Sequence, residues 1–300
     1  MYLFRFFTLF LFIVSTSIHI TASSFTKLQK DLEALTENHK AQIGIAVIIN
    51  SKDTVLINNH LRYPLMSVFK FHQSLAVTHT LESQGQALDS LLYINKNELS
   101  ENTYSPLRDK HPNTDLSLTV EELLQYTLLL SDNNACDILF RHIINVQKTN
   151  AYFQSLGINN LSIVATEEDM HQQTDLCYAN WSSPLATVKL LELLLNDKLV
   201  KGEYKDFIIN TMIQCETGKN RLPNFHHNGL TRIGHKTGTG DKNERGEIIG
   251  VNDIGFVLLP DGQHYTIAVF IKDSIDNLAD TERIIAAISS TVYASIKESK

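Results

Sequence analysis

The sequence Ser67-Val-Phe-Lys70 places a hydroxyl and an amine three positions apart, directly after the apolar run 64–66. On a helix, side chains three positions apart lie on the same face. The Lys70 amine can therefore reach the Ser67 hydroxyl, which needs an adjacent base to act as a nucleophile near neutral pH. The pattern predicts a helix carrying a reactive serine, although this spacing alone occurs by chance in many helices.

A second motif, Ser-Asp-Asn at residues 131–133, falls between two segments with helical spacing. There Ser131 can relay a proton and Asn133 can hydrogen-bond an amide of a ligand. The ordinary explanation of the motif is a helix N-cap, which Ser, Asp and Asn all favour. On its own it does not separate a catalytic role from a structural one.

A third motif, Lys-Thr-Gly at residues 236–238, ends a predicted strand. Strand alternation puts Lys236 and Thr237 on opposite faces, and Gly238 leaves room for the backbone of a ligand. These two side chains can bind an anionic carboxylate, and a backbone amide beyond the glycine can face an oxyanion. Lys-Thr-Gly is also a frequent strand end, but the three motifs together and in this order predict one catalytic site.

The composition is that of an ordinary globular protein. The chain has 300 residues, 43% of them apolar and 20% charged, so it can form one large domain or two intertwined lobes. Its formal net charge of -7 argues against a nucleic-acid partner, which would require a basic face. A small molecule is the expected partner.

Residues 1–22 differ sharply from the rest of the chain. Arg5 is the only charge before Lys27, the segment 6–20 is mostly apolar, and small residues follow it. This pattern predicts a secretory signal peptide cleaved near Ala22. The alternative is a membrane anchor, but polar residues interrupt the run and leave it marginal for spanning a bilayer. No stable membrane association is expected after cleavage.

Three cysteines, Cys136, Cys177 and Cys215, are too few and too odd in number for a disulfide framework. One bridge is possible, but three partly buried small side chains are the simpler interpretation. No spacing resembles a zinc site despite 12 histidines. We therefore expect neither a metal nor another cofactor.

The order of strands and helices predicts an α/β (α+β) fold. Stretches typical of strands lie near both ends of the chain, at 42–49, 54–57, 231–236, 252–259 and 265–272. Stretches with helical spacing lie at 25–40, 68–81, 120–130, 134–143, 150–156, 185–195, 204–214 and 282–297. This order predicts one antiparallel sheet built from distant segments, with an all-helical lobe (66–221) inserted into an α/β lobe (23–65 and 222–300). The groove between the lobes is a natural place for a ligand.

With these motifs the chain resembles the serine β-lactamases and penicillin-binding proteins, whose signature is Ser-x-x-Lys, Ser-x-Asn and Lys-Thr-Gly. The resemblance covers essentially all of residues 23–300 and looks like class A. Tyr104-Ser-Pro matches an aromatic wall at the cleft mouth, and Thr217-Gly-x-x-Arg221-Leu matches a segment that supplies an arginine near the carboxylate pocket. Residues 255–273 match the last two strands. The resemblance implies a five-stranded antiparallel sheet flanked by helices.

A glutamate separates the hydrolases in this group from the D,D-peptidases, because rapid release of an acyl-enzyme requires a general base. Class A enzymes carry that base on a loop that ends near Asn180-Trp in this sequence. The spacing to His171 and Asn180 makes Glu167 the best match. Glu168 and Asp169 are the alternatives, and we expect them to be solvated loop charges.

This loop departs from the commonest class A pattern at two places. His171 replaces the asparagine that helps to hold the hydrolytic water, and it either contacts that water or packs. Ala165 and Asn180 replace an arginine–aspartate ion pair that braces the loop, which puts its rigidity in doubt. Both departures resemble the extended-spectrum subgroup A2, which includes the PER and CfxA types.

The resemblance also implies a division of chemical roles. Ser67 attacks the lactam carbonyl, and the amides of Ser67 and Thr239 stabilise the oxyanion. Either Lys70 or Glu167, acting through a water, accepts the serine proton, and Ser131 passes a proton to the leaving nitrogen. Glu167 then activates the hydrolytic water. The expected substrate-binding residues are Tyr104, Asn133, Arg221, Lys236, Thr237, Gly238 and Thr239, with His171 and Asn180 behind them.

Two segments bear on the substrate. The connection 241–250 is long and charged, and the segment 101–113 is longer than minimal. Longer loops at the rim of a cleft can widen it, so we expect cephalosporins, including oxyimino ones, to be preferred over penicillins.

The sequence therefore predicts a monomeric periplasmic β-lactamase that needs no cofactor. A penicillin-binding D,D-peptidase with the same three motifs is the first alternative. The second is a sensor domain that only traps β-lactams, which would require a membrane-tethered partner domain.

Overall fold

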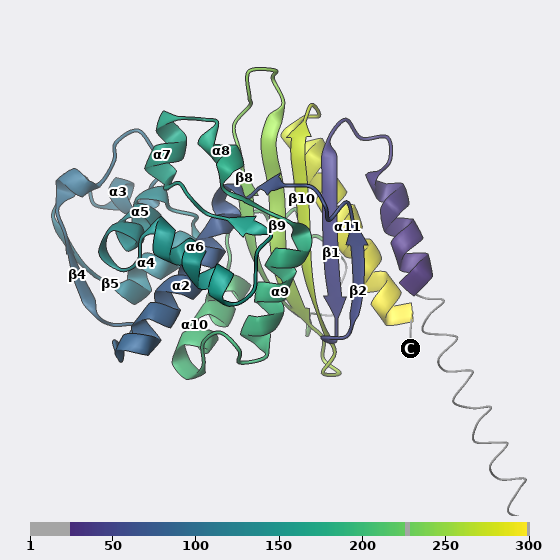
Figure 1. The fold of residues 1–300 in the computed structure, drawn as a ribbon, viewed down its shortest axis with the longest axis horizontal. Helices are drawn as coiled ribbons and strands as arrows, with labels where there is room; N and C mark the ends of the chain where they lie inside the picture. Colours follow the sequence, from purple (N-terminus) through teal and green to yellow (C-terminus); the bar gives the residue numbers. More distant parts are fainter. Residues whose placement is uncertain (1–24, 226–228, 299–300) are drawn as a thin grey trace, which may run out of the picture.

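The computed structural model of the chain describes residues 25–225 and 229–298 (Figure 1). The predicted signal peptide at 1–22 lies outside the described residues, so the leader and the periplasmic location stay predictions. Within the described part, no helix combines the length and the apolar character needed to cross a bilayer.

A five-stranded antiparallel sheet forms the centre of the α/β part, in the order β2-β1-β10-β9-β8. Its strands are β1 (Gln42–Ile49), β2 (Asp53–Ile57), β8 (Arg232–Thr239), β9 (Ile248–Leu258) and β10 (His264–Ser274). The expected sheet, assembled from the two ends of the chain, is therefore confirmed.

The connection between β8 and β9 is shorter than predicted. Residues 248–250 are already part of β9, and the Gly240 amide donates to the Gly250 carbonyl at 2.8 Å. Pairing with β8 draws this end of the segment into the sheet, so only 240–247 remain as the loop.

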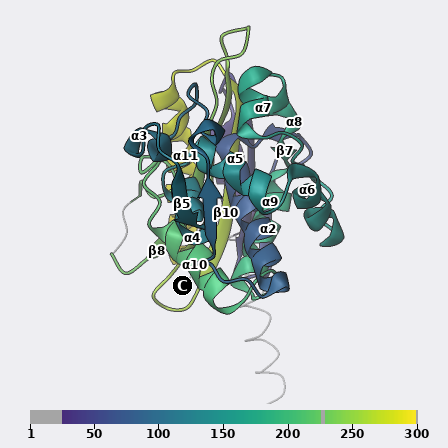
Figure 2. The ribbon, with the colours of Figure 1, turned by 90° about the vertical axis from the view of Figure 1, so that its left-hand side faces the viewer.

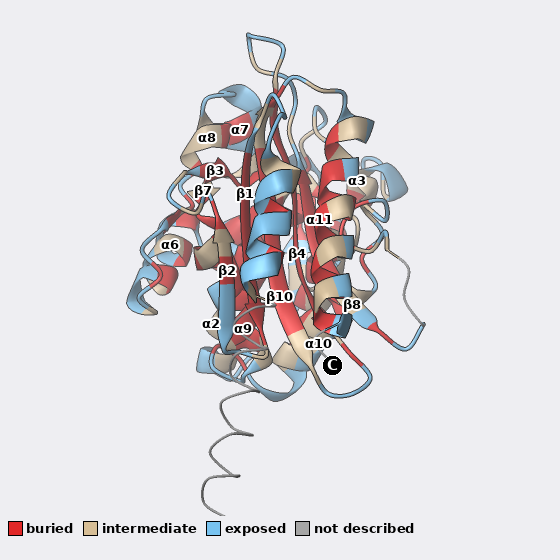
Figure 3. Ribbon diagram, turned by 90° about the vertical axis from the view of Figure 1, so that its right-hand side faces the viewer, coloured by how far each residue is buried: buried red, intermediate tan, exposed pale blue. Residues whose placement is uncertain are grey.

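Both faces of the sheet are buried. In β1, Ile43, Ile45 and Val47 face an outer cluster, whereas Ala46 and Ile48 face the inner one. The helix at residues 25–36 and α11 (Leu278–Glu298) cover the outer face (Figure 3). A strand buried on both sides is a nearly continuous apolar run, so the sequence of β1 predicts a strand clearly.

The helical part packs on the inner face of the sheet, where Figures 1 and 2 show it as a separate layer. Its longer helices are α2 (Phe69–Gln84), α4 (Val120–Leu129), α5 (Asn133–His142), α6 (Val146–Ser155), α9 (Pro184–Leu195) and α10 (Gly202–Ile213). Each matches a predicted helix to within a few residues. The predicted lobe boundaries themselves stay a prediction, since α9 of the helical part packs on β1 and β10.

Several short elements were not predicted. The helical ones are the turn η1 (Met66–Val68), η2 (Lys96–Glu98), α3 (Pro106–Lys110), α7 (Glu167–Gln172) and α8 (Leu176–Ala179). The strands are β3 (Tyr63–Pro64), β4 (Leu91–Ile94), β5 (Leu116–Thr119), β6 (Leu161–Ser162) and β7 (Trp181–Ser182), which form two small sheets. Segments this short complete too few periods to be recognised from their pattern.

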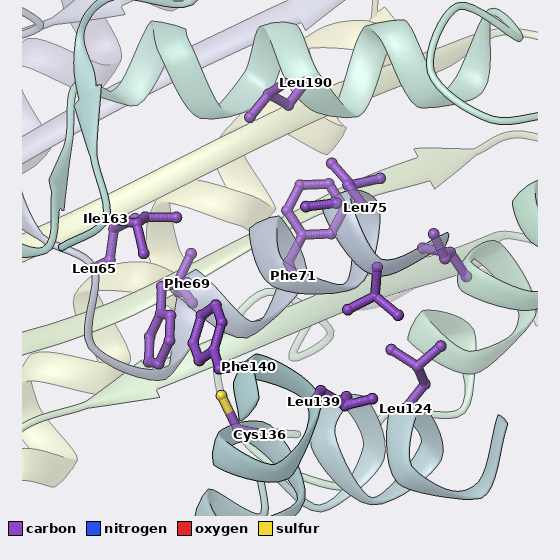
Figure 4. Packing of buried hydrophobic residues seen from close by; sticks show 14 of the residues in the cluster. Leu65, Phe69, Phe71, Leu75, Leu124, Cys136, Leu139, Phe140, Ile163 and Leu190 are labelled. Atoms are coloured by element: carbon purple, nitrogen blue, oxygen red, sulfur yellow. The ribbon is translucent and has the colours of Figure 1, made fainter. Parts of the chain in front are cut away.

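Helix α2 runs through the middle of the helical part, buried on almost every side (Figure 4). Phe69 stacks on Phe140 of α5, with ring centroids 5.9 Å apart. Phe71 and Leu75 point toward Leu190 of α9. Close packing around this helix fixes its N-terminal end, where the serine and lysine of the first motif lie.

Candidate active site

Ser67 lies in the 3₁₀ turn η1, immediately before α2. Met66 enters this turn with a φ of 45°, a left-handed conformation that is uncommon for a residue with a side chain. Asn252 of β9 anchors the residues just before this turn, because its side-chain amide donates to the Pro64 carbonyl at 2.7 Å and to the Leu65 carbonyl at 3.1 Å. The turn that presents the serine is therefore anchored to the sheet.

The structure gives a different reason for Gly238 than the one predicted. A Cβ at this position would lie 2.7 Å from the Leu65 carbonyl oxygen and 3.0 Å from the Val68 amide. The glycine is therefore required by the protein's own serine-bearing turn, which packs directly on β8. Contact of a ligand with Gly238 stays a prediction.

The side chain of Lys70 joins the three parts of the site. Its Nζ lies 2.7 Å from Glu167 Oε1, 2.6 Å from Asn133 Oδ1, 2.7 Å from the Ser131 carbonyl and 3.2 Å from Ser67 Oγ. Lys70 is fully buried. A buried ammonium is tolerated only when it is paired and hydrogen-bonded, and these four oxygens meet that condition.

Glu167 is the carboxylate that faces the serine. Its Oε1 lies 3.5 Å from Ser67 Oγ, which can donate to it. The two alternative acids have other surroundings. Glu168 is exposed to solvent, and Asp169 accepts from the Thr166 amide at 2.9 Å in a capping box. The structure therefore brings together Ser67 and the glutamate that the sequence favoured.

Asn180 takes over the bracing of the loop. Its Oδ1 accepts from the Val164 and Ala165 amides at 2.8 and 3.0 Å, and its Nδ2 donates to the Ala165 carbonyl at 2.8 Å. Because Asn180 is fully buried, these bonds form away from competing water. On this side the loop is held by hydrogen bonds in place of the ion pair, and the reduced rigidity stays a prediction.

Asp137 of α5 was missed by the sequence analysis. Its two carboxylate oxygens accept from the Glu167 and Glu168 amides at 2.9 and 2.8 Å, at the start of α7. Burial, followed by the charge of Glu167, raises the pKa of Asp137 to about 7. The available signal was its position one helical turn after Asn133, on the same face of the helix.

A second buried lysine lies on the opposite side of Ser131. Lys236 Nζ donates to Ser131 Oγ at 2.9 Å and to the Thr237 carbonyl at 2.8 Å. Burial, followed by the charge of Lys70, lowers the pKa of Lys236 to about 7. This lysine can therefore exchange a proton with the Ser131 hydroxyl near neutral pH.

These groups open onto a cleft of about 590 Å³ between the helical part and β8. Tyr104 lines it with 59% of its surface exposed, and His171 lines it as well. Other lining residues are Ser67, Thr103, Ser131, Asn133, Glu167, Thr217, Thr237 and Thr239. The predicted groove and most of the predicted site residues therefore coincide.

Arg221 is buried behind the cleft wall instead of projecting into it. Its guanidinium pairs with Glu282 at 3.0 Å and donates to the carbonyls of Gly238 and Asn252 at 3.2 and 2.8 Å. A further bond of 2.6 Å reaches Thr239 Oγ1, which lines the cleft. The arginine can therefore act on a bound anion through Thr239.

The three cysteines are free and buried, so no bridge joins them. Over the described ranges, no group of three or more His, Cys, Asp or Glu side chains is arranged to hold a metal ion. The expectation that the site works without metal or cofactor stays a prediction.

Comparisons with known proteins agree with this geometry. Residues 27–296 match the model of a family described as the beta-lactamase enzyme family. A beta-lactamase of Bacteroides uniformis is 40% identical over 279 residues, which are 93% of this chain and 94% of the relative. The extended-spectrum beta-lactamase PER-1 of Pseudomonas aeruginosa is 32% identical over 284 residues, or 94% and 92% of the two chains.

A solved structure gives the same result. The crystal structure of a class A beta-lactamase from Bacteroides cellulosilyticus superposes with a TM-score of 0.87 at 41% identity, covering 92% of this chain and 99% of the other.

The contribution of Asp137 can be measured directly. Asp137→Ala removes the acceptor for two amides at the start of α7, so hydrogen exchange at Glu167 and Glu168 should become about tenfold faster or more. Exchange read by mass spectrometry of peptides from this loop checks this. Asp175→Ala, an exposed acid of the same loop, is the matched control and should leave the exchange unchanged. Equal protection in both variants would mean that Asp137 does not position Glu167.

Proposed function

The chain belongs to the beta-lactamase enzyme family as a class A serine β-lactamase, and from this we propose that Ser67 forms an acyl-enzyme which water activated by Glu167 hydrolyses. The observation that carries the proposal is the position of Glu167 Oε1, 3.5 Å from Ser67 Oγ and 2.7 Å from Lys70 Nζ. A carboxylate held at this distance can serve as a general base toward the serine or toward a water beside it.

In the first step, Ser67 Oγ attacks the lactam carbonyl while its proton leaves to a base. The contacts favour Glu167 over Lys70 as that base, because Lys70 Nζ is surrounded by the acceptors of three residues besides Ser67 and donates to them as an ammonium. The negative charge that develops on the carbonyl oxygen is stabilised by the amides of Ser67 and Thr239.

Collapse of the tetrahedral intermediate breaks the carbon–nitrogen bond and requires a proton for the leaving nitrogen. Ser131 Oγ supplies it, since this hydroxyl lines the cleft and accepts from Lys236 Nζ at 2.9 Å. Lys236, whose pKa is about 7, returns the proton to Ser131. Asn133 meanwhile offers its amide to the side chain of the substrate.

The substrate carboxylate binds at the β8 side of the cleft. Thr237 and Thr239 present hydroxyls there, and Lys236 contributes positive charge from behind. Arg221 reinforces the site through its 2.6 Å bond to Thr239. Charge-assisted hydrogen bonds of this kind orient the lactam over Ser67.

Release of the acyl group separates this reaction from that of a D,D-peptidase. Glu167 removes a proton from water, the hydroxide attacks the ester carbonyl, and the proton returns to Ser67. A peptidase with the same three motifs lacks a general base positioned to activate the hydrolytic water, so it stays acylated by the β-lactam. The proximity of Glu167 to Ser67 therefore disfavours the peptidase alternative.

The test of the proposed function is the Glu167→Ala variant. It should acylate Ser67 more slowly, with Lys70 left as the base, and should release the acyl group roughly 100-fold to 10,000-fold more slowly, the usual contribution of a general base. Intact-protein mass spectrometry after mixing with a cephalosporin should show a persistent adduct, whereas Glu168→Ala should turn over like the wild type. Turnover by Glu167→Ala at the wild-type rate would refute the role of Glu167.

We further propose a preference for cephalosporins, including oxyimino ones. Asn102, Thr103 and Tyr104 form one rim of the cleft, and Gly240 and Asp241, at the start of the connection 240–247, form the other. That connection is braced, since Asn243 donates to the Tyr178 hydroxyl at 3.2 Å. The relative PER-1 carries an extended-spectrum name, which supports the same direction.

Steady-state kinetics on purified protein tests the substrate preference. We expect a higher kcat/KM for an oxyimino cephalosporin than for benzylpenicillin, because the two rims leave room for a bulky side chain. Much higher efficiency on the penicillin would contradict the preference while leaving β-lactam hydrolysis intact.

A further inference from the structure

Behind the carboxylate side of the cleft lies a buried cluster that the mechanism above does not use. His235 of β8 bonds through Nδ1 to both carboxylate oxygens of Asp253 of β9, each at 3.0 Å. The same imidazole hydrogen-bonds Cys215, which follows α10. The exposed fractions of Cys215, His235 and Asp253 are 6%, 2% and 0%.

A chain of hydrogen bonds runs from this cluster to the cleft. Cys215 Sγ lies 3.4 Å from Thr217 Oγ1, closer than to the Thr217 carbonyl oxygen at 3.7 Å. Thr217 Oγ1 lies 2.6 Å from Thr237 Oγ1. Both threonines line the cleft, and Thr237 is the residue whose hydroxyl meets the substrate carboxylate in the proposed function. The inference below rests on that assignment.

The proton on Cys215 decides the direction of this chain. A thiol can donate to Thr217 Oγ1, the nearer of its two acceptors; Thr217 then donates to Thr237 Oγ1, and the Thr237 proton is left to point into the cleft. A thiolate can only accept, so Thr217 donates to sulfur and Thr237 donates to Thr217. In that second arrangement Thr237 presents lone pairs to the cleft, where they repel a carboxylate.

The groups facing Cys215 favour its ionisation within an accessible pH range. Burial would lower the pKa of His235, but the charge and hydrogen bonds of Asp253, followed by Cys215, raise it to about 10, so the imidazole is protonated. Burial opposes ionisation of Cys215, yet His235, then the charge of Lys236 and the bond to Thr217, lower its pKa below 9.0.

We propose that Cys215 is a positioning residue for substrate binding: its thiol proton sets the direction of the Thr217–Thr237 hydroxyl pair, and with it the ability of Thr237 to donate to the carboxylate of a β-lactam. The thiol form exists at the lower pH, so binding is strong there and weakens as pH rises through the ionisation of Cys215. The chemical step at Ser67 does not pass through this chain.

The test is a pair of pH profiles from about pH 6 to about pH 10. In the wild type, KM for an anionic cephalosporin should rise roughly tenfold as Cys215 ionises, the effect of one hydrogen bond to a charged group. The ultraviolet absorbance of the thiolate should rise over the same interval. The other two thiols do not interfere, because burial raises the pKa of Cys177 to about 11 and raises that of Cys136 well above its ordinary value.

Two variants and a control isolate the role of Cys215. Cys215→Ser keeps a neutral donor that does not ionise in this range, so this rise in KM should be lost. His235→Asn removes the imidazolium, so the thiolate absorbance and the rise in KM should both move to higher pH. Cys136→Ala, a buried thiol outside the cleft, should keep the wild-type profile.

Lys236 also loses charge on the alkaline side, and the profiles separate its effect. Because the Cys215 charge raises the pKa of Lys236, a rise in KM caused by Lys236 would move to lower pH in Cys215→Ser instead of disappearing. A rise in KM that moves to lower pH in Cys215→Ser, or one that stays unchanged, would overturn the proposal.

If Cys215→Ser does not fold, the wild-type profiles alone provide the test. The proposal is overturned if the pH at the midpoint of the rise in KM differs from the pH at the midpoint of the rise in thiolate absorbance. A wild type that hydrolyses no β-lactam would instead reject the proposed function.

Discussion

The buried ammonium of Lys70 is the interaction on which the rest of the site depends. A lysine without exposed surface requires compensation. Here a hydroxyl from its own segment and a carboxylate, a side-chain amide oxygen and a backbone carbonyl from two other segments of the chain supply it. Removing one partner of a buried ion pair typically costs about 3–5 kcal/mol. The burial of Lys70 and the position of Glu167 beside the serine therefore stabilise each other.

Ser131 shows how closely the two lysines are coupled. Its carbonyl accepts from Lys70 and its hydroxyl accepts from Lys236, an arrangement that its left-handed backbone, with a φ of 61°, makes possible. Two cations this close oppose each other, which contributes to the lowered pKa of Lys236. Met66, with a φ of 45°, is the other left-handed residue beside the reactive groups. Both conformations carry strain, and the surrounding hydrogen bonds hold them in place.

Much of this arrangement could be predicted because its residues act locally or belong to long periodic segments. Strands β1 and β10 are largely apolar on both faces, and the three motifs lie at helix starts and a strand end, so their patterns are visible in the sequence. Asn252 could not be assigned, because it holds a backbone segment far away in sequence and belongs to no motif. For Asp137 the only signal was its position one helical turn after Asn133. Arg221 was predicted to be near the carboxylate site, but its pairing with Glu282 of α11, which buries it, is a tertiary contact.

The loop that carries Glu167 is held by hydrogen bonds to its backbone instead of by an ion pair between side chains. Asn180 and Asp137 bind its backbone amides directly, so the loop is held by neutral and charge-assisted hydrogen bonds in place of an ion pair. Such bonds position the backbone at the start of α7, and hence the glutamate, more specifically than a contact between two long side chains would.

The single-turnover kinetics of Lys70→Ala test the central dependence on this lysine most directly. Stopped-flow mixing with a chromogenic cephalosporin separates acylation of Ser67 from release of the acyl group. Because Ser67 and Glu167 share the same ammonium, both rate constants should fall by roughly a hundredfold or more. A variant that acylates slowly but releases its product at the wild-type rate would show that Glu167 is held independently of Lys70, and would contradict the account.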